Sequence, residues 1–215
     1  MGKAEKKTGI IVVYFLCSVM IQCPMLFSLM LTGAAEQFPN SSTMAIQLIY
    51  TLTTFGGLLG TFLSGKLPSM YSKKILLCIF MLTNTLAGVI GLLLNKSLVM
   101  VYVASALIGV GNYAISNLLA AVIVENFDME KRSAIMGVQG AFVSVGGLVM
   151  MFVGGLLADK KWTNAYYPFL IFIVLFIVTA ILLPKGPVEE KKTDTGEKQV
   201  LKVCSQSVLA ASFMA

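Results

Sequence analysis

The stretch GGLLGTFLSGKL at residues 56–67 returns 90 residues later as GGLVMMFVGGLL at residues 146–157. Six of the twelve positions are identical without a gap. A weaker match, at an offset of 89, pairs residues 36–38 with residues 125–127. Self-similarity at a fixed period indicates that the chain is built from two related units, and it constrains the fold more strongly than any local pattern.

Six long apolar segments contain and surround these copies. Hydrophobic residues make up 57% of the 215 residues and charged residues only 12%, whereas a soluble domain carries roughly 25% charged residues. A helix needs about 20 mostly apolar residues to cross a hydrocarbon core about 30 Å thick. The segments that meet this requirement are residues 9–32, 43–65, 74–94, 97–124, 133–157 and 165–183. They do not alternate as barrel strands do, so we expect an all-α integral membrane protein with six transmembrane helices.

The two copies of the repeat fall in the second and the fifth of these segments. Three crossings therefore separate them, and an odd number of crossings reverses the direction of the chain in the membrane. The sequence predicts an inverted 3+3 repeat, in which one unit of three helices is turned upside down relative to the other. The alternative is a chance similarity between two glycine-rich membrane helices.

Basic residues concentrate in alternate loops, and Lys and Arg are enriched in cytoplasmic loops. One side would carry nine of them, namely Lys3, Lys6, Lys7, Lys66, Lys73, Lys74, Lys131, Arg132 and Lys185. The other side would carry three, namely Lys96, Lys160 and Lys161. We therefore expect a multi-pass protein of the cell membrane with both termini in the cytoplasm. Residues 1–8 would be the cytoplasmic N-terminus, residues 9–184 the six-helix domain and residues 185–215 a flexible cytoplasmic tail.

Several function classes find no support in the composition. The chain has no histidine, and three of its four cysteines lie in apolar segments, where cysteine behaves as a small hydrophobe. We expect no metal site, no cofactor and no catalytic residue, because a membrane enzyme would need a cluster of reactive side chains at the membrane face. The net charge of +6 is attributed to the loops that set orientation, so nucleic acid is not an expected partner.

The loop after the second segment reads GKLPSMYSKK at residues 65–74. It resembles the loop 2–3 signature of the major facilitator superfamily, Gly-x-Leu-Ala-Asp-Arg-x-Gly-Arg-Arg, and the matching positions are Gly65, Leu67, Lys73 and Lys74. Ser69 stands where the family has an Asp that helps to latch the cytoplasmic side. The fifth segment is similar to the antiporter signature of the same family at Gly137, Gly146, Gly154 and Gly155.

The resemblance covers about residues 10–184, which correspond to the N-terminal six-helix half of a twelve-helix family. It implies secondary active transport of a small solute by alternating access, with helices 1, 2, 4 and 5 lining a central cavity. Ser105 stands where the family has an Arg that is linked to proton coupling, which argues against drug–proton antiport. The implied partners are the lipid bilayer, a small-molecule solute and a second six-helix bundle, supplied by a homodimer or by a missing half.

Uncharged polar side chains gather on faces of the predicted helices. Tyr14, Ser18 and Gln22 follow at intervals of four and so share one face, and Pro24 behind them predicts a kink. The candidates for a substrate path are Gln22, Gln47, Tyr50, Asn112, Tyr113, Asn117 and Gln139. Hydrogen bonding between helices is the alternative role of each residue. No charged residue lies well inside a predicted helix, so no proton relay is named.

A charged cluster follows the fourth segment on the expected cytoplasmic side. Glu125, Asp128 and Arg132 are candidates for a gate, in which opposite charges pair when that side is closed. A solvated loop is the alternative. At the level of the whole chain, two readings stay open: a half-length or truncated transporter of this family, and a membrane scaffold or sensor partner that does not transport.

Overall fold

The computed structural model describes the backbone of residues 3–183 and the side chains of residues 7–183. The predicted tail at residues 185–215 lies outside the described residues. The described part contains helices and no strand: α1 (Lys3–Met20), η1 (Cys23–Met25), α2 (Leu26–Gln37), α3 (Thr43–Lys66), η2 (Leu67–Ser69), α4 (Lys73–Leu93), α5 (Leu98–Asn126), α6 (Met129–Lys160), η3 (Trp162–Tyr166) and α7 (Tyr167–Leu182).

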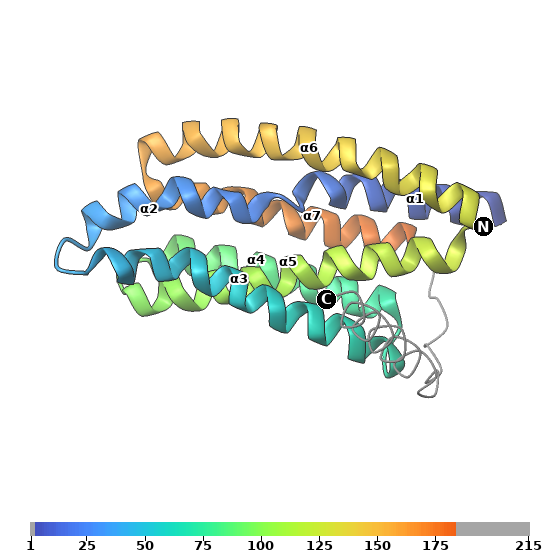
Figure 1. The fold of residues 1–215 in the computed structure, drawn as a ribbon, viewed down its shortest axis with the longest axis horizontal. Helices are drawn as coiled ribbons and strands as arrows, with labels where there is room; N and C mark the ends of the chain where they lie inside the picture. Colours follow the sequence, from blue (N-terminus) through green and yellow to red (C-terminus); the bar gives the residue numbers. More distant parts are fainter. Residues whose placement is uncertain (1–2, 184–215) are drawn as a thin grey trace, which may run out of the picture.

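Six segments of this chain are long and apolar enough to cross a membrane. They are Lys7–Gln37, Thr43–Ser69, Lys73–Leu93, Leu98–Asn126, Met129–Lys160 and Trp162–Leu182. The predicted class, an all-α membrane protein with six transmembrane helices, is confirmed. Successive crossings run in opposite directions, so the α3–α4 and α5–α6 connections lie at the same end of the bundle as the N-terminus (Figure 1).

The first crossing is broken at its centre, as Pro24 predicts. Proline has no N–H to donate and forces the chain out of regular α-helix. Between α1 and α2 the chain forms a short 3₁₀ turn, in which the Met25 N–H donates to the Gln22 carbonyl at 3.0 Å. In an unbroken α-helix that N–H would donate to Ile21 instead. The break therefore leaves the Ile21 carbonyl without its usual helical partner.

The packing of the two three-helix units confirms the inverted repeat. Gly56, the first residue of the first copy, lies where a Cβ would meet the Ala106 carbonyl, so α3 packs backbone to backbone on α5. Gly146, its counterpart in the second copy, lies where a Cβ would meet the Val19 carbonyl, so α6 packs in the same way on α1. Small residues allow this close approach of helices in lipid. Each unit thus seats its second crossing on the first crossing of the other.

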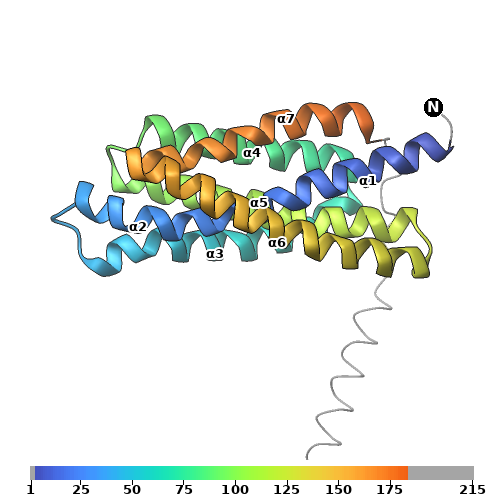
Figure 2. The same cartoon turned by 90° about the horizontal axis from the view of Figure 1, so that it is seen from above.

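The exposed faces of α3 and α6 also correspond to each other in the repeat. Leu58 and Phe62 on α3, and their counterparts Leu148 and Phe152 on α6, are all largely exposed. The third crossings, α4 and α7, pack against each other. They lie along one side of the bundle, opposite α3 and α6 (Figure 2).

A network of hydrogen bonds connects three crossings at the end remote from the N-terminus. The Trp162 indole donates to the Gln37 side-chain oxygen at 2.8 Å. The Gln37 amide donates in turn to the Asn95 carbonyl at 2.9 Å, and the Asn95 amide donates to the Leu92 carbonyl at 2.6 Å. These bonds hold the ends of α2 and α4 and the start of η3 together.

Candidate functional site

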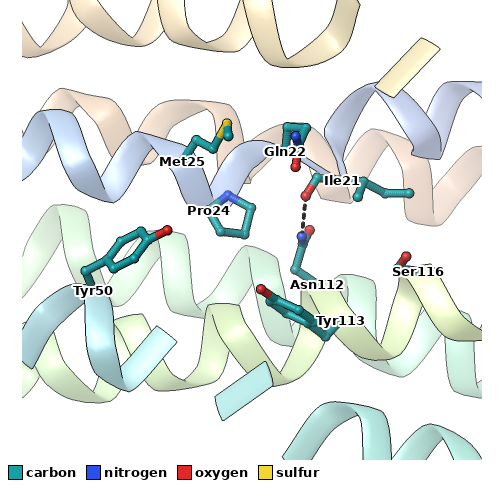
Figure 3. Close-up of a pocket in the computed structure, with 8 residues that line it drawn as sticks. All are labelled: Ile21, Gln22, Pro24, Met25, Tyr50, Asn112, Tyr113 and Ser116. Carbon is teal, nitrogen blue, oxygen red and sulfur yellow. Dashed lines mark hydrogen bonds between the residues drawn. The ribbon is translucent and has the colours of Figure 1, made fainter. Parts of the chain in front are cut away.

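A pocket of about 260 Å³ lies at the break in the first crossing, between that crossing, α3 and α5 (Figure 3). None of its lining side chains carries a charge. The residues that line it are Ile21, Gln22, Pro24, Met25, Tyr50, Asn112, Tyr113 and Ser116. The wall is therefore a mixture of amide, phenol and hydroxyl groups with a proline ring, a thioether and an aliphatic side chain.

Asn112 holds the broken crossing in place. Its side chain is only 3% exposed, and its Nδ2 donates to the Ile21 carbonyl at 2.7 Å. A buried carbonyl without a partner is costly in lipid, so this amide satisfies the group that the helix break releases. Behind it lies the fully buried Asn84. The Asn84 amide is assigned the orientation in which both of its ends are paired. In that orientation its nitrogen donates to the Ile108 carbonyl at 3.2 Å and its oxygen accepts from the Asn112 backbone N–H at 3.3 Å.

The two tyrosines of the pocket point their hydroxyl groups toward its interior from opposite sides (Figure 3). Tyr50 comes from α3 and Tyr113 from α5, and they are 45% and 42% exposed. The Tyr113 ring contacts Gly57, where a Cβ would meet three of its ring carbons. The glycine therefore decides where this ring can lie.

Three of the predicted path residues lie outside this pocket. Gln47 is exposed on α3, nearer the start of that helix than Tyr50. Asn117 donates to the Ser64 hydroxyl at 3.2 Å, and Gln139 accepts a hydrogen bond from the Tyr14 hydroxyl at 2.5 Å. Gln22, Tyr50, Asn112 and Tyr113 are brought together at the pocket.

Four lining residues are absent from the predicted path: Ile21, Pro24, Met25 and Ser116. Ser116 could have been found, because it follows Asn112 by four residues and so shares its helical face. Ile21 and Met25 carry no polar side chain to mark them. Ile21 contributes its backbone carbonyl, which a sequence pattern reveals only through the helix break at Pro24.

A model of the Major Facilitator Superfamily matches residues 10–215. The chain belongs to the major facilitator superfamily. Members of this superfamily are membrane transporters rather than enzymes, so the chain is a membrane transport protein. No curated protein matches the chain. Among the described residues there is no group of three or more His, Cys, Asp or Glu side chains that could hold a metal ion.

The residues of the predicted loop 2–3 motif lie at the N-terminal end of the bundle, where two of them bond to other helices. Lys73 is buried and its Nζ lies 2.5 Å from the Glu125 carboxylate at the end of α5. Lys74 donates to the Ala180 carbonyl of α7 at 2.6 Å. Gly65 lies in the last turn of α3 and faces open space, and Leu67 is half-buried against the core.

The three predicted gate residues lie at this same end of the superfamily bundle without pairing among themselves. Glu125 is held by Lys73. Asp128 precedes α6 in extended conformation, and the Arg132 Nε donates to the Phe127 carbonyl at 2.6 Å. Arg132 thus fixes the α5–α6 connection through the backbone.

Proposed function

We propose that the chain forms one bundle of a secondary active transporter that moves a small solute by alternating access, with the pocket at the helix break as its solute site. The observation that carries the proposal is the pocket itself. It combines a broken membrane helix, uncharged hydrogen-bonding groups and a position between the two inverted units. Secondary transporters bind substrate near the bilayer midplane, at repeat interfaces formed by discontinuous helices.

A second six-helix bundle would complete the path. Gly137, Gly140 and Gly155 share a face of α6 where a Cβ would meet no atom within 4 Å. Tyr50 and Tyr113 are left partly exposed beside the pocket. A matching bundle, in a second copy or on another chain, would cover these groups and form the opposite wall. Rocking of the two bundles would then open the pocket to one side at a time.

We further propose that the end carrying the α3–α4 and α5–α6 connections faces the cytoplasm, in the cell membrane. Lys66, Lys73, Lys74, Lys131 and Arg132 lie in or beside these connections, whereas Lys96, Lys160 and Lys161 lie at the other end. The excess of basic residues supports this orientation through the positive-inside rule. The N-terminal and C-terminal segments would both be cytoplasmic.

The proposal is tested by purifying the chain in mild detergent, measuring its mass by light scattering and screening solutes by thermal unfolding. A solute that binds only the folded state raises the unfolding midpoint. We expect a dimer whose midpoint is raised by at least one small solute. A monomer that no solute stabilises would contradict the proposal and favour a scaffold or sensor partner that does not transport.

A further inference from the structure

The pocket is assembled from matching positions of the two inverted units. Gly57 and Gly147 are the second glycines of the two copies of the repeat. Gly57 lies against the Tyr113 ring, and a Cβ at Gly147 would lie 3.4 Å from Cγ of Gln22. Tyr113 and Gln22 are 91 residues apart, which is within one residue of the repeat offset. The pocket therefore lies where the two units meet, and Gly57 makes room for the Tyr113 ring while Gly147 lies beside Gln22.

The hydrogen bond that closes this arrangement also joins matching positions. Asn112 and Ile21, the donor and acceptor of the 2.7 Å bond, are again 91 residues apart. One unit supplies a side-chain amide and the other a released carbonyl. The two units are therefore not equivalent at the pocket, and they present different chemical groups to its two sides.

Several polar groups of the pocket have hydrogen-bonding capacity to spare. Within the part of the chain that the structure describes, the Gln22 amide and the hydroxyls of Tyr50, Tyr113 and Ser116 make no hydrogen bond. The Asn112 amide uses its N–H for Ile21 and keeps its oxygen as an acceptor. Hydroxyl and amide groups both donate and accept. A bound solute would therefore meet donors and acceptors together, on more than one side.

The remaining lining is flat and apolar. The Tyr113 ring, seated on Gly57, and the Pro24 ring present broad faces, with Met25 and Ile21 beside them. Aromatic faces favour stacking against flat partners, and a thioether adapts to irregular apolar edges. A compact ring with polar groups on its rim fits such a wall, whereas a flexible chain would lose more conformational freedom on binding.

On the wall that this chain supplies, the absence of charge among the eight lining side chains disfavours an ionic solute. A charge that leaves water must be paired, or it loses much of its solvation free energy without compensation. The described charged residues nearest in sequence to these groups, such as Lys7, Glu36 and Glu125, lie toward the ends of the helices. A neutral solute avoids this cost.

We propose that the pocket binds an uncharged ring compound with several hydrogen-bonding groups on its rim, the chemistry shared by monosaccharides and nucleosides. The inference rests on the proposed function, because it takes this pocket as the solute site. Gln22, Tyr50, Tyr113 and Ser116 hydrogen-bond the rim, and the Tyr113 face stacks on the ring. Gly57 determines where the Tyr113 ring lies.

The test is equilibrium binding to the purified chain in lipid nanodiscs, with radiolabelled glucose and uridine as probes. Their charged counterparts, gluconate and uridine monophosphate, serve as the comparison. We expect at least one neutral probe to bind. Its charged counterpart should bind more weakly by a factor of about ten or more, and tenfold is the equivalent of about 1.4 kcal/mol. Glucose and uridine as separate arms distinguish the sugar from the nucleoside.

Two variants link this binding to the pocket, and one is a matched control. Tyr113→Phe removes only a hydroxyl and Gln22→Ala removes the amide, and each should weaken binding of the preferred neutral probe about five- to tenfold. Tyr167→Phe removes a hydroxyl from an exposed tyrosine at the start of α7 and should leave binding unchanged.

Two results would overturn the inference: binding of neither neutral probe, or binding of a charged counterpart at least as tightly as its neutral form. Equal loss of binding in Tyr167→Phe and Tyr113→Phe would also overturn it, since the effect would then not belong to the pocket. Uptake into vesicles is measured separately on the same preparations. Selective binding of a neutral probe without uptake would support the pocket chemistry and contradict the transport function.

Discussion

The Asn112 side-chain amide donates a 2.7 Å hydrogen bond to the backbone carbonyl of Ile21, the group released where the first crossing breaks before Pro24. The two residues come from different three-helix units. This bond joins the repeat, the helix break and the pocket in a single contact.

Replacing Asn112 should destabilise the bundle. Asn112→Ala leaves the Ile21 carbonyl without a partner in a membrane interior, and we expect a loss of about 1–2 kcal/mol in unfolding free energy. Asn117→Ala is the matched control, because Asn117 is exposed and bonds another side chain. Reversible unfolding in mixed micelles measures both. Equal stability of Asn112→Ala and the parent chain would refute the role given to this bond.

Restoring the missing N–H should straighten the first crossing. Pro24→Ala allows the chain to continue in α-helix, so that the Met25 N–H competes with Asn112 for the Ile21 carbonyl. We expect the separation between spin labels at positions 16 and 31, on either side of the break, to change, and neutral probes to bind less tightly. Unchanged label distances would mean that the break does not depend on the proline.

The repeated first glycines should tolerate substitution poorly and to a similar degree. In Gly56→Ala and Gly146→Ala the new methyl group meets a carbonyl of the neighbouring helix, so we expect losses of about 1–3 kcal/mol. Gly65→Ala is the control, since Gly65 lies inside α3 and its Cβ would meet no atom within 4 Å, and alanine is the better helix former. Thermal unfolding compares the three. A loss in Gly65→Ala as large as in the other two would argue against the packing described.

Removing one partner of the Lys73–Glu125 pair should cost more unfolding free energy than removing both. Lys73→Met leaves the carboxylate beside an apolar side chain, and because Glu125 is partly exposed we expect a loss of about 1–3 kcal/mol. The double variant Lys73→Met with Glu125→Leu should lose less than Lys73→Met alone, because it leaves no charge unpaired. Unfolding of single and double variants measures the difference, and additive losses would contradict it.

Much of this fold could be predicted from the sequence, because lipid requires about 20 apolar residues per crossing and the repeat fixes how the crossings pair. The residues at which the crossings begin and end were harder to predict. α6 begins at Met129 rather than near residue 133, because charged residues such as Glu130 continue the helix beyond its apolar part. Hydropathy records the apolar part of a helix, not the turns that extend past it.

The site was only partly predictable, because helical periodicity gives the face of a side chain but not the helix opposite. Tyr14 and Gln22 share a face of the first crossing, yet Tyr14 bonds Gln139 of α6 while Gln22 lines the pocket. Glu125, predicted as a gate residue, pairs with Lys73, which is 52 residues away in sequence. Such partners follow from tertiary packing, which no local pattern contains.

Two-sided thiol labelling of a cysteine at position 116 tests whether the pocket opens to each side of the membrane in turn. The background carries serine at Cys17, Cys23, Cys78 and Cys204, and Leu86→Cys, which is exposed near the middle of α4, provides the lipid-facing comparison. A membrane-impermeant reagent is applied to right-side-out and to inside-out vesicles. We expect Ser116→Cys to react from both sides and Leu86→Cys from neither. Protection of Ser116→Cys from both sides would contradict a pocket that opens alternately across the membrane.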